Sequence, residues 1–192
     1  LGILGFFKYF NFFNSNIADL AHLIGWNYPL VLLQVLLPIG LSFHTFQSIS
    51  YVIEVYKGNQ KVEKNGGIYA LYVMFFPQLV AGPIERPQHL LHQLHEKHEF
   101  DFQRVGRGFE LMLWGFFKKL VVADRLALLV NTVYGDVGSY TGIPLILATI
   151  FFAFQIYCDF SGYSDIAIGS AKILGIDLME NFRRPYFSRS IS

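Results

Sequence analysis

The chain has 192 residues, of which 53% are hydrophobic and 15% are charged, and its formal net charge is +1. Because a soluble domain is typically closer to one quarter charged, this composition favours a membrane protein. The nearly balanced charge gives no concentrated basic face, so we expect no nucleic-acid partner. The single cysteine, Cys158, excludes an internal disulfide and any cysteine-based zinc cluster.

Polar residues interrupt the apolar segments, so the membrane spans have to be inferred from broken runs. We expect an all-α fold, a polytopic membrane helix bundle with about three full spans, one truncated span and a re-entrant segment. We interpret residues 1–192 as a single incomplete domain, an internal fragment of a longer protein. In chain order, the helical segments are expected at 1–13, 28–53, 66–80, 105–133 and 141–174.

Positive charge in the connections indicates which side of the membrane each one occupies. Lysine and arginine concentrate in three stretches, residues 54–65, 84–107 and 183–189. Basic connections tend to stay cytoplasmic, so the first two stretches belong on the same side of the membrane. The segment 66–82 between them is also short for a span. We therefore expect it to be re-entrant, which in turn requires cover from protein or water.

Polar residues enter the last apolar segment in a helical pattern. Gln155, Asp159 and Tyr163 recur every four residues, and Ser161 and Asp165 form a second pair with that spacing. A carboxylate at membrane depth is costly and usually faces a bundle interior or a wet cavity. The pattern favours the wall of a polar tunnel, with hydrogen bonding between packed helices as the alternative. Glycines such as Gly162 and Gly169 permit close helix packing.

Residues 76–87 contain three prolines and a glycine, which predict a rigid break rather than a helix. Glu85 and Arg86 follow the break, and they either hold a polar substrate or belong to a structural turn.

Basic side chains also lie inside apolar runs. Lys118 and Lys119 either contact an anionic cofactor or extend to lipid headgroups. His44 is a candidate base, relay or packing residue.

Four histidines, at 89, 92, 95 and 98, recur every third residue. This spacing rotates around a helix instead of gathering ligands on one face, so we expect no metal site. Leu90, Leu91 and Leu94 complete an amphipathic pattern that is typical of an interfacial helix on the cytoplasmic surface.

Four blocks of the sequence together resemble one family. They are Phe76–Pro87, Trp114–Lys119, Tyr157–Gly169 and Asn181–Ser192. These blocks are similar to those of the membrane-bound O-acyltransferases, and most similar to the branch that O-acetylates alginate in bacteria. The resemblance extends over residues 28–192 and implies a multi-helix bundle around a funnel through the bilayer.

The resemblance also implies acyl transfer, with acetyl-CoA or an acyl carrier as the donor substrate and no tightly bound cofactor. It implies a multi-pass protein of the bacterial inner membrane that works with an extracytoplasmic polysaccharide acetylation partner. The family's catalytic histidine is expected beyond Ser192, so no catalytic residue is assigned here. Supporting roles are implied for the polar residues above and for Asn181, Arg183, Arg184 and Tyr186.

Two other functions fit the same residues. Broken helices with buried carboxylates also mark the solute paths of transporters and channels, although no inverted repeat is visible in this sequence. A non-catalytic membrane remnant would keep the packing residues alone. A histidine within a Trp- and Arg-rich block after residue 192 would favour the enzyme, and a stop codon would favour the remnant.

Overall fold

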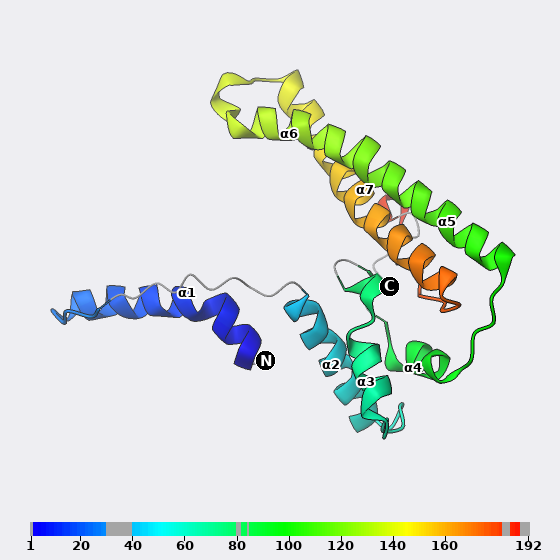
Figure 1. The fold of residues 1–192 in the computed structure, drawn as a ribbon. Coiled ribbons are helices and arrows are strands. Elements are labelled where there is room, and N and C mark those ends of the chain that lie inside the picture. The colour runs from blue at the N-terminus through cyan, green and yellow to red at the C-terminus, as the bar shows by residue number, and fades with distance from the viewer. Residues whose placement is uncertain (1, 30–39, 80–81, 84, 182–184, 189–192) are drawn as a thin grey trace.

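The computed structural model describes residues 2–29, 40–79, 82–83, 85–181 and 185–188, and the regular structure in these ranges is helical (Figure 1). The α-helices are α1 (Gly2–Leu23), α2 (Leu41–Tyr56), α3 (Gly66–Val73), α4 (Pro87–His95), α5 (Phe102–Phe116), α6 (Asp124–Gly135) and α7 (Ile143–Ile173). A π-helical segment, η2 (Phe117–Ala123), joins α5 to α6. The 3-10 turns are η1 (Phe76–Gln78), η3 (Val137–Ser139) and η4 (Pro185–Phe187). The expected all-α class is confirmed for these residues.

Two long antiparallel helices form the largest unit. α5, η2 and α6 continue one another as a single rod, and α7 lies along that rod (Figure 1). Asp101 begins the rod by accepting hydrogen bonds from the backbone N–H groups of Gln103 and Arg104, at 2.8 and 3.2 Å. A helix start leaves such donors without partners, so this cap stabilises it.

Glycines allow the two long helices to approach each other closely. A Cβ atom on Gly108 would lie 2.7 Å from the carbonyl oxygen of Gly169, and one on Gly115 would lie 2.6 Å from that of Gly162. A side chain at these positions would therefore push the backbones apart. Small residues at such contacts are typical of helix pairs in membranes, and the predicted close packing at Gly162 and Gly169 is confirmed.

The second unit gathers α2, α3, α4 and the chain after α7 (Figure 1). Its buried core comprises Tyr51, Tyr72, Phe75, Leu90, Leu91, Ala171, Ile176 and Leu178. Ala171 near the end of α7 and Ile176 just after it both lie in this core, so the cluster connects the two units.

Gly175 directs the chain out of α7 and into this core. Its φ is +89°, a left-handed conformation that favours glycine, and a Cβ there would meet His98 at 2.8 Å. The backbone N–H groups of Gly175 and Ile176 donate to the carbonyls of Lys172 and Ala171, each at 3.0 Å. This is the Schellman arrangement, which satisfies the last carbonyls of a helix and turns the chain away from its axis.

The structure corrects the expectation for α4. The helix is amphipathic, but Leu90 and Leu91 are 0% and 2% exposed and pack in the protein core. The interfacial interpretation was wrong about this face because tertiary packing, rather than lipid, covers it.

The span count remains a prediction. Within the described residues, Ile143–Ile173 is the one helix that qualifies as a membrane span by length and composition. The run expected at 105–133 is helical over 102–135, and part of the segment expected at 28–53 lies outside the described residues. The predicted break after α3 is confirmed. With eight residues, α3 is about 12 Å long and falls short of a hydrocarbon core of about 30 Å.

Adding one methyl group at a glycine contact tests the packing of the long helices. We expect Gly115→Ala to lower the free energy of unfolding by about 1–3 kcal/mol, because the new Cβ meets a backbone carbonyl. Gly106→Ala on the same helix meets nothing within 4 Å and should stabilise by about 0.5–1 kcal/mol. Unfolding of the purified full-length protein in detergent measures both, and equal effects at the two sites would contradict this packing.

Cysteine labelling tests the re-entrant placement of residues 66–82. In a protein with the buried Cys158 replaced by serine, we expect cysteines at the exposed positions Lys64 and Glu96 to react from the cytoplasmic side. The reason is that basic connections flank the segment at both ends. Reaction of the two sites from opposite sides of the membrane would show that the segment crosses it.

Candidate functional site

Lys118 lies in η2 and points its ammonium group at α7. The residue is 9% exposed, and its Nζ donates to the Ser161 hydroxyl at 2.5 Å. The same Nζ forms an ion pair with Asp165 Oδ2 at 2.5 Å. The sequence pairs Ser161 with Asp165 by their spacing, and the structure places one lysine against both.

Lys119 occupies the corresponding place on the other polar stripe. Its Nζ lies 2.6 Å from Asp159 Oδ1 and 2.9 Å from Asp124 Oδ1. It also lies 5.3 Å from the centre of the Tyr163 ring, within the range of a cation–π contact. Gln155, the third member of that stripe, keeps a buried Oε1 that has no hydrogen-bond partner within the described residues. The stripe therefore faces the α5–η2–α6 rod, with Lys119 among its polar groups.

This lysine–aspartate network lies near the middle of the longest apolar helix. At about 1.5 Å per residue, Asp159 is about 24 Å from the start of α7 and about 21 Å from its end. Isolated charges at such a position are expensive, whereas opposite charges that pair with one another are tolerated. Pairing thus explains how α7 can keep a polar section between two apolar ones.

The π-helical segment η2 presents these lysines. Both Lys118 and Lys119 lie within Phe117–Ala123, where the backbone departs from α-helical winding. Short π-helical insertions are rare and frequently occur at functional sites. Here the insertion places consecutive residues against the two different carboxylates Asp165 and Asp159 of α7.

Glu85 lies outside this network and is fully buried. Its Oε2 accepts a hydrogen bond from His89 Nδ1 at 2.9 Å, and its Oε1 accepts one from the backbone N–H of Met179. Burial raises the pKa of the Glu85 carboxyl above its usual range, and the hydrogen bonds from Met179 and His89 act in the opposite direction. Arg86, the next residue, is exposed.

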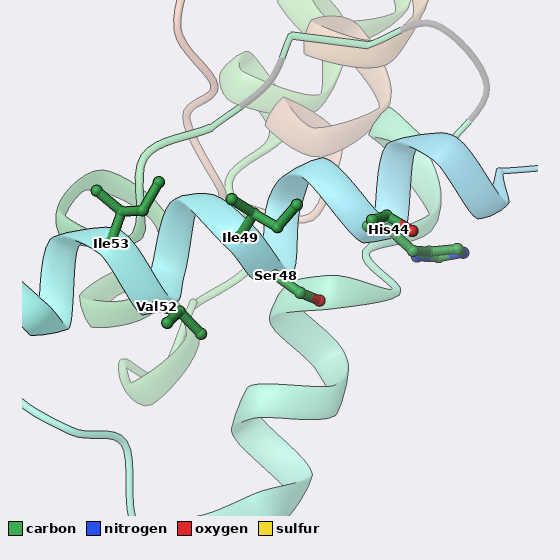
Figure 2. Close-up of a pocket in the computed structure, with 6 residues that line it drawn as sticks. His44, Ser48, Ile49, Val52 and Ile53 are labelled. Atoms are coloured by element: carbon green, nitrogen blue, oxygen red, sulfur yellow. The ribbon is translucent and has the colours of Figure 1, made fainter. Parts of the chain in front are cut away.

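His44 begins a groove of about 390 Å³ along α2 that is also lined by Thr45, Ser48, Ile49, Val52 and Ile53 (Figure 2). Its Nδ1 donates to the carbonyl of Val73 at 2.8 Å, so one ring nitrogen is used to join α2 to the end of α3. The network of η2 and α7 contains no contact with this histidine among those described.

The four histidines from 89 to 98 contact four different acceptors. His89 and His95 face Glu85 and Glu63, while His92 and His98 face the carbonyls of Gln88 and Gln93. Within the described residues, no group of three potential ligands is arranged to hold a metal ion. The absence of a metal site remains a prediction.

The segment after residue 180 returns to α7. The Tyr186 hydroxyl donates to the Ala153 carbonyl at 2.7 Å, and its ring lies 5.9 Å from that of Tyr157. Asn181 is exposed, and the predicted site residues Arg183 and Arg184 lie outside the described residues.

Comparison with known proteins decides the family. The model of the membrane-bound O-acyltransferase family matches residues 68–192, which include η2 and the whole of α7. The chain belongs to the membrane-bound O-acyltransferase family. The predicted resemblance is thereby confirmed.

Relatives within the family act on different polymers by name. A probable alginate O-acetylase of Pseudomonas aeruginosa is 42% identical over 100% of this chain and 36% of that protein. A peptidoglycan O-acetyltransferase of Helicobacter pylori is 34% identical over 100% of this chain and 40% of that protein. A teichoic acid D-alanyltransferase of Bacillus subtilis is 24% identical over 80% of this chain and 39% of that protein. The chain thus spans well under half the length of these relatives.

Sequence reasoning missed how the charges of this chain combine. It treated Lys118 and Lys119 separately from the carboxylates of α7, and it gave Asp124 no role. One signal was available, because two neighbouring apolar runs carried charges of opposite sign that membrane burial obliges to pair. The hydrogen bonds between Gln93 and the backbone of Asp177 could not be predicted from the local sequence pattern.

Removing one charge of the Lys118–Asp165 pair should destabilise the protein more than replacing both residues by apolar ones. Because both side chains are largely buried, at 11% and 18% exposure, we expect Asp165→Asn to cost about 3–5 kcal/mol of stability. The double variant Lys118→Met with Asp165→Leu removes both charges and should cost less than either single change. Asp124→Asn is the control, since that carboxylate is 45% exposed and should contribute about 0.2–1 kcal/mol.

Unfolding of the purified full-length variants in detergent provides the comparison. If the double variant loses as much unfolding free energy as the two single variants combined, the two charges do not interact.

Proposed function

We propose that this chain is part of a membrane O-acyltransferase that modifies an extracytoplasmic polysaccharide. In the complete protein, an acetyl group moves from an activated cytoplasmic donor to hydroxyl groups of the polymer. The donor is a thioester, acetyl-CoA or an acyl carrier, and is consumed as a substrate rather than held as a cofactor. The proposed location is the bacterial inner membrane, which a multi-pass protein crosses to join the two sides.

The observation that carries this proposal is the lysine–aspartate network halfway along α7. Transfer between the two sides of a membrane needs a polar region at mid-depth, and here two lysines and three aspartates supply one. The names of the relatives support acyl transfer to a cell-envelope polymer. Among these acceptors we favour alginate or a similar polysaccharide, because the probable alginate O-acetylase is 42% identical over the full chain.

The chemistry consists of one acyl substitution. A general base removes the proton from the acceptor hydroxyl, the oxygen attacks the carbonyl carbon of the thioester, and the thiolate leaves. We assign the base to a histidine outside residues 1–192, in line with the resemblance. Within this chain, Asp159, Tyr163 and Asp165 keep the path polar and ordered, while Arg183 and Arg184 attract an anionic donor or polymer.

Changing Asp159 tests the assignment. In the full-length protein we expect Asp159→Ala to reduce polymer acetylation strongly, because Lys119 loses a partner and the groups that order the path shift. Asp159→Asn should give a smaller loss, since the amide still accepts a hydrogen bond from Lys119. The measurement is O-acetyl content of the polymer per amount of membrane-inserted protein.

Asp136→Asn is the matched control, because that carboxylate is exposed in the turn before α7 and accepts a local hydrogen bond from the Ser139 hydroxyl at 2.5 Å. Normal acetylation by both Asp159 variants would reduce Asp159 to a packing residue. If the wild-type protein instead carries a solute across vesicles and acetylates nothing, the transporter interpretation replaces the enzyme.

A further inference from the structure

The chain that leaves α7 is held by side chains from the region of α4. Gln93 Oε1 accepts from the Asp177 N–H at 2.8 Å, and Gln93 Nε2 donates to the Asp177 carbonyl at 3.0 Å. Two residues further on, the Met179 N–H donates to Glu85 Oε1. Leu178, between them, is 7% exposed and packs in the core. The side chains of residues 177–179 therefore alternate between exposed and buried positions, as in an extended strand. The side chains of Gln93 and Glu85 form the backbone hydrogen bonds that a neighbouring strand would otherwise provide.

Glu85 is the unusual member of this arrangement, because it is 0% exposed and pairs with no lysine or arginine within the described residues. The titratable groups that face it are His89 from α4 and Tyr72 from α3, whose hydroxyl donates to the Glu85 carbonyl at 3.2 Å. The segment 177–179 faces it with a backbone N–H group. The hydrogen bonds from His89 and from the Met179 N–H are what accommodate this buried carboxylate.

We propose that Glu85, His89 and Gln93 form a clasp on residues 177–179, and that Glu85 is a positioning residue for acyl transfer. This inference rests on the proposed function. The clasp fixes the residues that directly follow α7. Further along, the Tyr186 hydroxyl is bonded to the carbonyl of Ala153, two residues before Gln155 of the polar section of α7. These two contacts are where the described residues after α7 are held against the protein, and the clasp is the first of them.

The contribution of Glu85 to stability depends on pH, and the sign follows from burial. Burial raises the pKa of the Glu85 carboxyl above its ordinary value of 4.5. The stability that this group contributes is fully present below pH 4.5 and is lost as the pH rises through the raised pKa of the folded protein. Glu85→Gln removes this dependence, because the amide oxygen accepts from Met179 and the amide nitrogen donates to His89.

A distance measurement tests the clasp without reference to catalysis. In the full-length protein with Cys158→Ser, spin labels replace Met179 and His92, whose side chains are exposed. We expect a narrow distance distribution in the protein that keeps Glu85. Glu85→Gln should also give a narrow distribution, because the amide oxygen still accepts from the Met179 N–H, and Glu85→Ala should give a broad one. Gln93→Leu, which loses both bonds to Asp177, should also broaden the distribution.

Rates measured per inserted molecule test the positioning role. We expect Glu85→Ala to lower kcat about tenfold or more with the KM for the donor unchanged, because misplaced groups slow transfer. Glu85→Gln should restore the rate, because its amide oxygen still accepts from the Met179 N–H. Rescue by the uncharged isostere distinguishes positioning from a need for the charge itself.

Each contrary result has a defined meaning. A narrow distribution in Glu85→Ala and Gln93→Leu overturns the clasp, and a normal kcat in Glu85→Ala overturns the positioning role. If Glu85→Ala does not insert, Gln93→Leu and Glu85→Gln decide the same two points. A wild-type protein that transfers no acyl group overturns the proposed function and the positioning role, while the distances still decide the clasp.

Discussion

Ion pairing between η2 and α7 constrains the rest of the molecule. Asp159 and Asp165 lie in the polar section near the middle of α7, and they are tolerable there because lysines meet them. The lysines are in turn placed in a rod whose outer face is apolar. Because each charged set requires the other, the pairs oppose sliding of the two helices and fix their relative register.

Close packing makes this pairing possible. The contacts of Gly108 with Gly169 and of Gly115 with Gly162 bring two backbones together without intervening side chains. The lysines leave the rod three and four residues after Gly115, where η2 changes the winding of the helix. The aspartates lie three residues before and three after Gly162. Glycine contacts and ion pairs therefore belong to one interface, in which the small residues set the separation and the charges set the register.

The unit formed by α2, α3 and α4 is held together mainly by an apolar core rather than by ion pairs. Its core is built from aromatic and aliphatic side chains of α2, α3 and α4, and its polar groups are joined mainly to backbone atoms. Gly175 turns the chain out of α7 directly into that core, so the end of the long helix and the α4 region are mutually dependent. This geometry links the α4 region, on the predicted cytoplasmic side, to residues 177–179 directly after α7.

The sequence by itself determined the helical class, the family and the approximate extent of the long helices. Periodicity and helix-breaking residues are local signals, so α7 was placed within two residues of its observed bounds, and the break after α3 was found from its prolines. The polar stripes of α7 were visible for the same reason. Their partners were not, because Lys118 and Asp165 are 47 positions apart and no local pattern joins them. Tertiary structure alone decided which lysine meets which carboxylate, and it also decided that protein rather than lipid covers the apolar face of α4. Both depend on contacts between distant segments, whose geometry is set by packing rather than by the order of residues along one helix.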